Sequence, residues 1–317
     1  MPLHFTFRQL EYFVAVGEAG SIALAAEKVN VSSPSISTAI THLEEEFGLQ
    51  LFVRKHAQGL ALTQAGRQFI TQAVEVLKQA ESLNRLAADV SGKVQGPISV
   101  GCLLTFAQLI VPRLRRKFES LYPEVRVLQF ELNQQDIFDD LRSGRIDIAL
   151  TYDLEIAPDL QFIPLQQLPP YVLLAETHPL ADEPTLTTGQ LNQHPMVLLD
   201  LPFSNEYFLS LFSKEHLNPL IAERTRDMAV MHALVANGFG YSIANAHPQN
   251  NLSPDGKKLR FIPLIGDVRP MTMGLALIPG AENVLTVRRF IEHCQEWVTK
   301  EAMLGSTARD RGRGGAP

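Results

Sequence analysis

The first part of the chain places apolar residues with the period of an α-helix. In residues 6–19 the apolar positions share one stripe, which comprises Phe7, Leu10, Phe13 or Val14, and Gly17. Gly20 and Ser21 then end this helix and begin the next. Residues 22–29 predict a second helix whose inward positions are Ile22, Ala25, Ala26 and Val29. The chain therefore begins with two short helices.

A third helix follows after residues 30–32, which leave room only for a tight turn. Ser32 or Ser33 can cap its first turn, and Pro34 fits there because the N–H that proline lacks has no helical partner at that position. Its buried stripe comprises Ile36, Ile40, Leu43 and Phe47, and Gly48 ends the helix. Residues 49–63 have the pattern of two short strands around residues 56–59. They predict a hairpin beside the three helices.

A long helix is predicted over residues 64–91, with Thr63 as its cap. Its apolar positions are spaced four and three residues apart and comprise Phe69, Ala73, Val76, Ala80, Leu83, Ala87 and Val90. Such a heptad stripe needs a partner helix, and we expect that a second copy of the chain supplies it. Homodimerisation or homotetramerisation follows from this expectation.

From residue 92 the pattern changes to β-branched runs separated by helical stretches at 105–121 and 134–142. A second unit repeats the plan, with helices near 204–215 and 227–236, strands near 259–265 and 271–278, and a last helix near 282–302. The fold class is thus α/β, with parallel sheets and crossover helices. We expect two lobes joined by crossings near Thr151–Tyr152 and near residues 262–271.

These elements divide the chain into four parts. Residues 1–63 would form the helical unit with its hairpin, 64–91 the linker helix, and 92–304 the two-lobed domain. The tail, residues 305–317, has few apolar side chains to bury, so we expect it to be disordered.

Composition excludes several classes of protein. Of 317 residues 45% are apolar, which is typical of a globular chain, and no apolar run approaches the length of a membrane-spanning helix. The two cysteines, Cys102 and Cys294, form no CxxC pair and imply neither a disulfide framework nor a zinc site. We expect a cytoplasmic protein without a metal or other cofactor.

Three helices followed by a hairpin have the geometry of a winged helix-turn-helix, which inserts its recognition helix into the major groove of DNA. The simpler alternative is a helical packing unit without DNA. Ser33, Ser35, Ser37 and Thr38 are the polar side chains of the first two turns, and Pro34 lies among them. Arg54 and Lys55 lie in the hairpin, and residues 50–68 contain no acid. We therefore predict Ser33, Pro34, Ser37, Thr38, Arg54 and Lys55 as contacts to a double-stranded DNA operator.

Residues 25–66 resemble the N-terminal signature of LysR-type transcriptional regulators. The matching positions are Ala25, Ala26, Ser32, Pro34, Ser37, Ile40, Leu43, Glu44, Gly48, Leu51, Phe52, Arg54, Leu62, Thr63, Ala65 and Gly66. The resemblance continues through a linker helix into a two-lobed domain of periplasmic-binding-protein type. Two positions depart from the family, which commonly has Gln at Ser33 and Arg at Thr38. The operator sequence of other members therefore cannot be transferred to this chain.

Enzymatic motifs are incomplete in this sequence. Residues 240–244 approach a nucleophile elbow, but a strand pattern follows Ser242 where the elbow needs a helix, and the last glycine is Ala244. Residues 238–240 likewise form only part of a dinucleotide fingerprint. We therefore predict no enzyme. The alternative that stays open is a small-molecule binding protein or enzyme that uses the α/β lobes and keeps the N-terminal unit for oligomerisation.

Two helices that begin after strands predict a small-molecule effector site, because α/β lobes bind ligands at the carboxyl ends of their strands. The first junction contributes Leu103, Leu104 and Thr105, and the second contributes Phe203 and Ser204. The family resemblance adds Asn133, Gln134, Tyr152 and Phe239. None of these is a Lys or Arg, although Arg226 could add a charge, so we expect a small apolar or aromatic monoacid. Cys102 is expected in the wall of this pocket.

Overall fold

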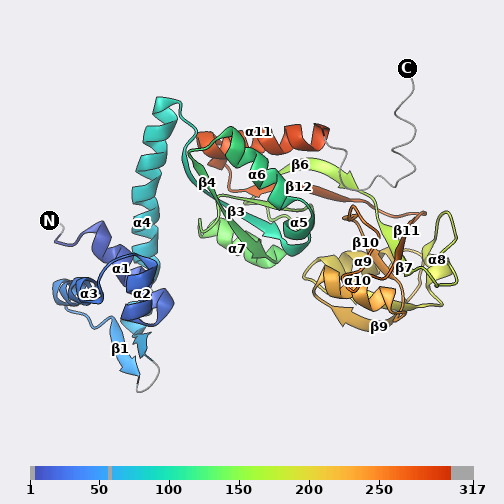
Figure 1. Cartoon of the computed structure of the whole chain (residues 1–317), viewed down its shortest axis with the longest axis horizontal. Helices are drawn as coiled ribbons and strands as arrows, with labels where there is room; N and C mark the ends of the chain where they lie inside the picture. Colours follow the sequence, from blue (N-terminus) through green and yellow to red (C-terminus); the bar gives the residue numbers. More distant parts are fainter. Residues whose placement is uncertain (1–3, 56–58, 301–317) are drawn as a thin grey trace. The chain divides into compact units, whose positions relative to one another are not determined.

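The computed structural model describes residues 4–55 and 59–300. This part of the chain divides into two compact units, of which the first ends at Val90 and the second begins at Ser91. Figure 1 shows the helices of the first unit and the two sheet-containing lobes of the second.

The first unit is a helix-turn-helix with a wing. Its elements are α1 (Phe7–Ala19), α2 (Ile22–Lys28), α3 (Ser33–Phe47), β1 (Phe52–Lys55) and β2 (Gly59–Leu62). The predicted caps are confirmed for α3, because the Ser32 hydroxyl accepts a hydrogen bond from the Ser35 N–H and Gly48 ends the helix at φ 61°. β1 and β2 pair antiparallel, so the predicted hairpin is also confirmed.

Aromatic rings fill the core of this unit. Phe13 lies 5.4 Å from Phe52 and 5.5 Å from Phe69, between ring centroids, and Phe47 lies 4.7 Å from Phe69. The predicted inward position of Phe7 is wrong, because its side chain is 55% exposed at the first position of α1. The side chains of Leu10 and Phe13, one and two turns further along α1, are buried.

The long helix α4 (Gln64–Ser91) has the predicted bounds and begins at Thr63, whose hydroxyl accepts from the Gly66 N–H at 2.8 Å. The heptad stripe, however, is not a single surface for a partner. Phe69 and Ala73 are packed in the core of their own unit, whereas Val76 is exposed and Leu83 is 66% exposed. The apolar stripe therefore stabilises the winged unit at Phe69 and Ala73 and is exposed at Val76 and Leu83.

Lobe I of the second unit is built on a five-stranded sheet of order β4-β3-β5-β12-β6. The strands are β3 (Gly96–Leu103), β4 (Val125–Leu132), β5 (Ile148–Tyr152), β6 (Gln161–Leu168) and β12 (Met271–Leu277). β3 is parallel to β4 and β5, whereas β12 is antiparallel to β5 and β6. The lobe I sheet is therefore mixed, not wholly parallel as predicted.

Helices cover both faces of the lobe I sheet. In Figure 1, α6 (Val111–Leu121) and α11 (Leu285–Lys300) lie on one side of the sheet and α7 (Gln134–Arg142) on the other. The single helix expected over 105–121 is wrong, because α5 (Leu104–Leu109) ends before α6 begins. Pro112 is in the first turn of α6, and its missing N–H prevents a continuous helix there.

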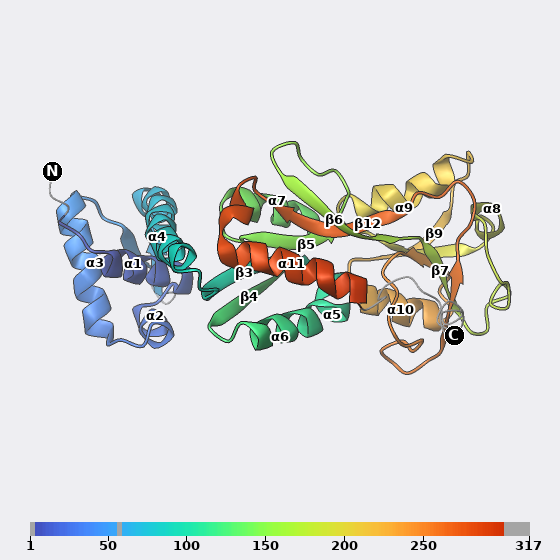
Figure 2. The same cartoon turned by 90° about the horizontal axis from the view of Figure 1, so that it is seen from above.

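Lobe II contains a three-stranded sheet of order β10-β7-β11 and a two-stranded parallel sheet of β8 and β9. Its strands are β7 (Tyr171–Ala175), β8 (Pro195–Leu199), β9 (Leu220–Thr225), β10 (Ser242–Ala244) and β11 (Leu259–Pro263). A bridge between Met196 and Tyr241 joins the two sheets. The short helix α8 (Thr188–Leu191) precedes β8, and α9 (Ser204–Ser213) and α10 (Met228–Ala236) lie on opposite sides of these strands in Figure 2.

The two lobes are joined by two crossings, one of which differs from the prediction. β6 pairs with β12 in lobe I, so the chain leaves that lobe at Pro169–Pro170 and not near Thr151–Tyr152. The local sequence of β6 does not reveal this pairing, because Pro164 and two glutamines interrupt its apolar pattern. The second crossing, residues 264–270, lies within the predicted range.

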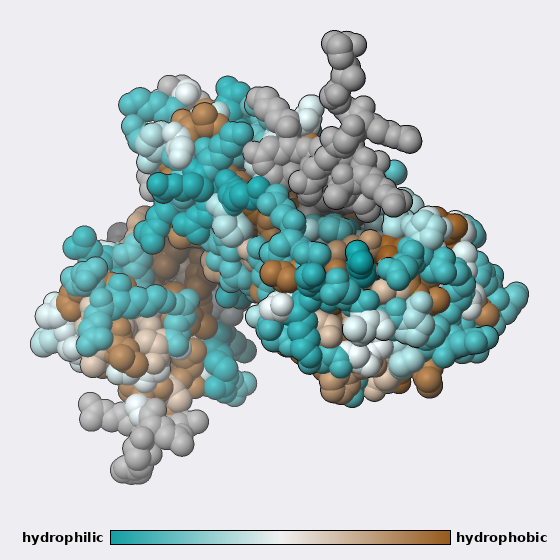
Figure 3. All heavy atoms as spheres, turned by 45° about the vertical axis from the view of Figure 1, so that its right-hand side comes forward, coloured by the Kyte–Doolittle hydropathy of each residue, from teal (hydrophilic) through white to brown (hydrophobic). Residues whose placement is uncertain are grey.

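In Figure 3, hydrophilic residues cover most of the visible surface, and apolar residues form small groups between them. Within residues 4–55 and 59–300, no helix is long and apolar enough to cross a membrane.

Candidate DNA-binding and effector-binding sites

The recognition helix α3 presents a row of short polar side chains. Pro34, Ser35, Ser37 and Thr38 are exposed, whereas Ser33 is half-buried. The Ser35 hydroxyl is 2.8 Å from that of Ser32 and is part of the cap. The hydroxyls of Ser37 and Thr38 make no hydrogen bond to any described residue, so both can bind an external group.

The wing is anchored to the helices by two contacts that the sequence did not reveal. The Glu44 carboxylate on α3 accepts from the N–H groups of Leu51 at 2.7 Å and Phe52 at 3.2 Å. The Leu60 N–H donates to the Gly20 carbonyl at 2.8 Å, and a Cβ on Gly59 would lie 2.6 Å from that carbonyl oxygen. Gly59 therefore permits a close approach of the wing to the turn between α1 and α2.

The predicted wing cations, Arg54 and Lys55, lie on β1, where their backbones pair with Leu60 and Gly59. Their side chains lie outside the part of the chain that the structure describes. Their contact with DNA therefore stays a prediction.

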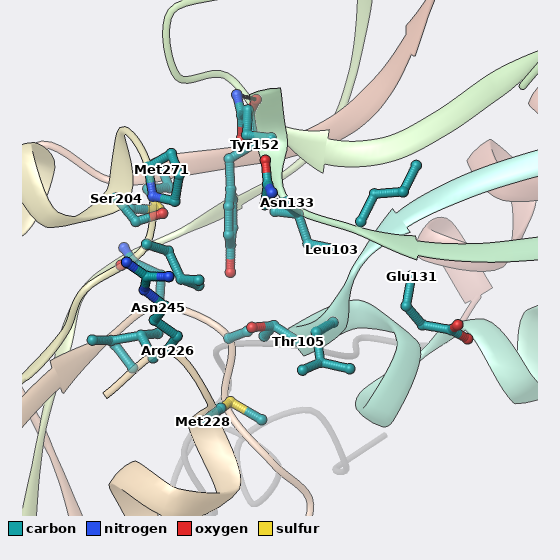
Figure 4. A pocket seen from close by; sticks show the side chains of 18 of the residues that line it. Leu103, Thr105, Glu131, Asn133, Tyr152, Ser204, Arg226, Met228, Asn245 and Met271 are labelled. Carbon is teal, nitrogen blue, oxygen red and sulfur yellow. Dashed lines mark hydrogen bonds between the residues drawn. The ribbon is translucent and has the colours of Figure 1, made fainter. Parts of the chain in front are cut away.

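In the second unit a cavity of about 330 Å³ opens where the lobes meet. Seven of the nine predicted effector residues line it: Leu103, Leu104, Thr105, Asn133, Gln134, Tyr152 and Ser204. They come from the carboxyl ends of β3, β4 and β5 and from the start of α9, as Figure 4 shows for the labelled residues. Strand ends from both lobes thus meet at one cavity.

Three largely buried residues present hydroxyl groups to this cavity. Thr105, Tyr152 and Ser204 are each more than nine-tenths buried, and their hydroxyls form no hydrogen bond within the described residues. In Figure 4 the Tyr152 ring extends into the middle of the cavity. Burial, with a smaller contribution from Tyr207, raises the pKa of Tyr152, so this hydroxyl is neutral and can donate a hydrogen bond. These hydroxyls face the cavity without a partner among the described residues, so they can donate hydrogen bonds to a polar group bound there.

Gln134 lies at the cavity but its amide is fully used by the chain. Its Nε2 donates to the carbonyls of Tyr152 at 3.2 Å and Leu154, and its Oε1 accepts from the Thr151 hydroxyl at 3.0 Å. Asn133 caps α7, because its Oδ1 accepts from the Asp136 N–H at 3.0 Å. Gln134 therefore holds the end of β5 and positions Tyr152.

Two predicted effector residues do not line the cavity. Phe239 follows α10 and is exposed to solvent. Phe203 has φ 64° and ψ −35°, and the Ser204 N–H donates across it to the Pro202 carbonyl at 2.8 Å, which forms a γ-turn. This backbone directs the Phe203 ring away from the cavity, toward Phe138 of lobe I.

α5 and α9 begin beside the cavity without a side-chain cap. At the first turn of α9, however, the Ser204 N–H is already used by the γ-turn, and the Asn205 N–H donates to the Leu201 carbonyl. The side-chain hydroxyls therefore offer the clearer donors to a ligand.

The cavity is also lined by residues that the sequence reasoning left out, among them Phe208, Met228, Asn245 and Met271. Arg226 lines it as considered, and its guanidinium forms no ion pair with the described part of the chain. Arg226 and Asn245 immediately follow β9 and β10. The rule that placed Thr105 at a strand end would have found both.

Cys102 is not in the cavity wall, contrary to expectation. It points into the core from β3, where burial and the nearby Glu131 carboxylate raise its pKa to about 12. Cys294 is buried as well, and burial raises its pKa. Reactive cysteines have lowered pKa values, so neither site has the properties of a thiolate sensor.

Comparison with known proteins identifies the family. Residues 7–67 match the family described as bacterial regulatory helix-turn-helix protein, lysR family, and residues 91–299 match the LysR substrate binding domain. The chain belongs to the LysR family of transcriptional regulators. This LysR-type protein is thus a ligand-responsive transcriptional regulator, with a DNA operator and a small-molecule effector as partners.

Relatives and solved structures cover nearly the whole regulator. The Hca operon transcriptional activator HcaR of Escherichia coli is 29% identical over 292 residues, 91% of this chain and 97% of that protein. The crystal structure of HinK, a LysR family regulator from Pseudomonas aeruginosa, is 34% identical with a TM-score of 0.62, and covers 92% of this chain and 98% of its own. A hydrogen peroxide-inducible genes activator of Haemophilus influenzae is 26% identical over 86% of this chain and 91% of its own length.

Proposed function

We propose that this regulator responds to a small, largely apolar or aromatic monocarboxylate that binds in the cavity of the second unit. The observation that carries the proposal is a set of three hydroxyls on largely buried residues, without partners among the described residues, in a cavity wall otherwise made mainly of apolar side chains. Thr105, Tyr152 and Ser204 can donate to a carboxylate, and Arg226 supplies one positive charge. The leucine, methionine and phenylalanine side chains cover the apolar body.

The charges around the cavity disfavour a dianion more than a single carboxylate. Arg226 is the one cation among the lining residues, and Glu131 and Asp136 contribute two carboxylates. A dicarboxylate or a sugar phosphate would bring two negative charges against one cation, and the second charge would lose hydration without a partner. Charge therefore discriminates against polyanions in this cavity.

Thermal shift of the full chain with benzoate, phthalate and glucose 6-phosphate tests this proposal. We expect benzoate to raise the melting temperature and the two dianions to have little effect. Thr105→Val should reduce the benzoate shift, whereas Thr286→Val, at a buried threonine of α11 that does not line the cavity, should preserve it. Stabilisation by the dianions alone, or the same response in both variants, would overturn the proposal.

For the first unit we propose that Ser33, Pro34, Ser37 and Thr38 contact the operator in the major groove and that Arg54 and Lys55 contact phosphates. The free hydroxyls of Ser37 and Thr38 on the exposed side of α3 support this assignment. The exposed Val76 and Leu83 on α4 support a homodimer or homotetramer in which this helix meets a second copy. Salt-dependent binding to duplex DNA tests the first claim, because phosphate contacts make log K fall with log salt.

A further inference from the structure

Asn245 is a buried amide in the wall of the cavity, directly after β10. Its side chain is 2% exposed, and its Nδ2 donates two hydrogen bonds, to the Leu168 carbonyl at 2.8 Å and to the Tyr207 hydroxyl at 3.0 Å. A carbonyl can only accept, so the Leu168 bond fixes which end of the amide carries the nitrogen. The opposite atom, Oδ1, is buried without a hydrogen-bond partner among the described residues.

These two hydrogen bonds reach both crossings between the lobes. Leu168 is the last residue of β6, immediately before the first crossing at Pro169–Pro170. The Tyr207 hydroxyl donates to the carbonyl of Arg269 at 2.6 Å, in the second crossing. One amide group therefore connects a lobe II strand to both connecting segments.

The second crossing is also fastened to lobe I near Tyr152. The Arg269 guanidinium lies 3.3 Å from the Asp153 carboxylate, whose other oxygen accepts from the Thr272 N–H at 2.7 Å. The crossings also contact each other, because the Leu264 N–H donates to the Pro170 carbonyl at 3.2 Å. A continuous set of bonds thus runs from Asn245 to the residue that follows Tyr152 in the chain.

We propose that Asn245 is a positioning residue that fastens both crossings to the cavity wall, and that it transmits occupancy of the cavity to the hinge between the lobes. The second part rests on the proposed function, because it takes the cavity as the effector site. Buried polar atoms are normally paired. The Oδ1 atom of Asn245 has no partner among the described residues, so this amide keeps a free acceptor and can change partners when a ligand alters its surroundings.

Hydrogen exchange of the full chain without ligand tests the fastening. Tyr207→Phe removes the hydroxyl between Asn245 and Arg269 at a residue that does not line the cavity. Asn245→Asp replaces the donor that faces the Leu168 carbonyl. We expect amides in residues 264–273 to exchange at least tenfold faster in both variants, and amides in residues 166–172 to do so in Asn245→Asp.

Tyr241→Phe is the matched control, because the Tyr241 hydroxyl is equally buried in lobe II but has no partner among the described residues. Exchange at the crossings should stay unchanged in this variant. Equal exchange at the crossings in all three variants would overturn the proposal, as would a rise that is uniform over lobe II. Because no effector is needed, this result is independent of the thermal-shift test of the carboxylate proposal.

Discussion

The rings of Phe203 and Phe138 lie 6.1 Å apart between centroids and belong to different lobes. Phe203 belongs to lobe II and adopts φ 64°, which L side chains rarely do, whereas Phe138 is buried on α7 of lobe I. The strained turn thus places an aromatic contact between the lobes, beside the cavity that Pro202 and Ser204 line.

The backbone strain predicts an unusual order of stability at position 203. Phe203→Ala and Phe203→Gly both remove the ring, but glycine also relieves the strained backbone. We expect the glycine variant to be more stable than the alanine variant by about 1 kcal/mol, the reverse of the order in regular structure. Urea unfolding of both variants measures the difference, and a less stable glycine variant would contradict the strained γ-turn.

Two positions of the α4 stripe should respond differently to substitution. Leu83→Glu changes an exposed side chain, so we expect the melting temperature to stay within a few degrees while the mass from light scattering falls and DNA binding weakens. Phe69→Ala removes a half-buried ring that packs against the core of the winged unit and should destabilise that unit by about 2–3 kcal/mol.

Leu121→Glu, at an exposed leucine of the second unit, is the control for Leu83→Glu and should keep the parental mass. If Leu83→Glu also kept the parental mass, the pairing of α4 with a second copy would be wrong.

Arg54 is expected to bind phosphate rather than a base. Arg54→Ala should weaken binding to random-sequence duplex DNA and reduce the slope of log K against log salt by about one unit, as expected for one lost phosphate contact. Arg116→Ala, at an exposed cation on α6, should leave both values unchanged. An unaltered slope in Arg54→Ala would remove this residue from the DNA interface.

The two thiols should be unreactive in the folded protein. The pKa of Cys102 is raised to about 12, so at pH 8 the folded state holds a thiol where the unfolded state, with a pKa of about 8.5, holds a substantial fraction of thiolate. The folded state therefore binds more protons in this range, and the contribution of Cys102 to stability falls as the pH rises above about 8.5. Mass spectrometry should find no alkylation by iodoacetamide until the protein unfolds. Rapid alkylation of native Cys102 would contradict this prediction.

The elements that were predicted best are those whose sequence signals lie at or near their own ends. Ser32, Pro34 and Gly48 mark the ends of α3 within a few residues, and the same holds for the start of α4 at Thr63. The first crossing was misplaced because β6 depends on pairing with β12, more than 100 residues later. The local sequence pattern of β6 gives no information about its partner strand β12.

The cavity shows the same division between local and distant information. Thr105 and Ser204, predicted from strand ends, lie at the cavity, as do Asn133, Gln134 and Tyr152 from the family resemblance. Phe239, also taken from the resemblance, lies outside it. Phe203 does not line the cavity because of a backbone conformation that the sequence does not predict. The role of Asn245 depends on hydrogen bonds to Leu168 and Tyr207, which only the fold brings together.

In the proposed effector site, the cavity hydroxyls and one cation select a monocarboxylate. Titration calorimetry of benzoate against the full chain and Tyr152→Phe tests it most directly, because this substitution removes one hydroxyl and keeps the ring. We predict that the wild type binds benzoate, that Tyr152→Phe weakens binding about 5- to 20-fold, equivalent to ~1–2 kcal/mol, and that phthalate binds at least tenfold more weakly than benzoate. Tighter binding of phthalate, or equal benzoate affinity in Tyr152→Phe and the wild type, would refute this selectivity.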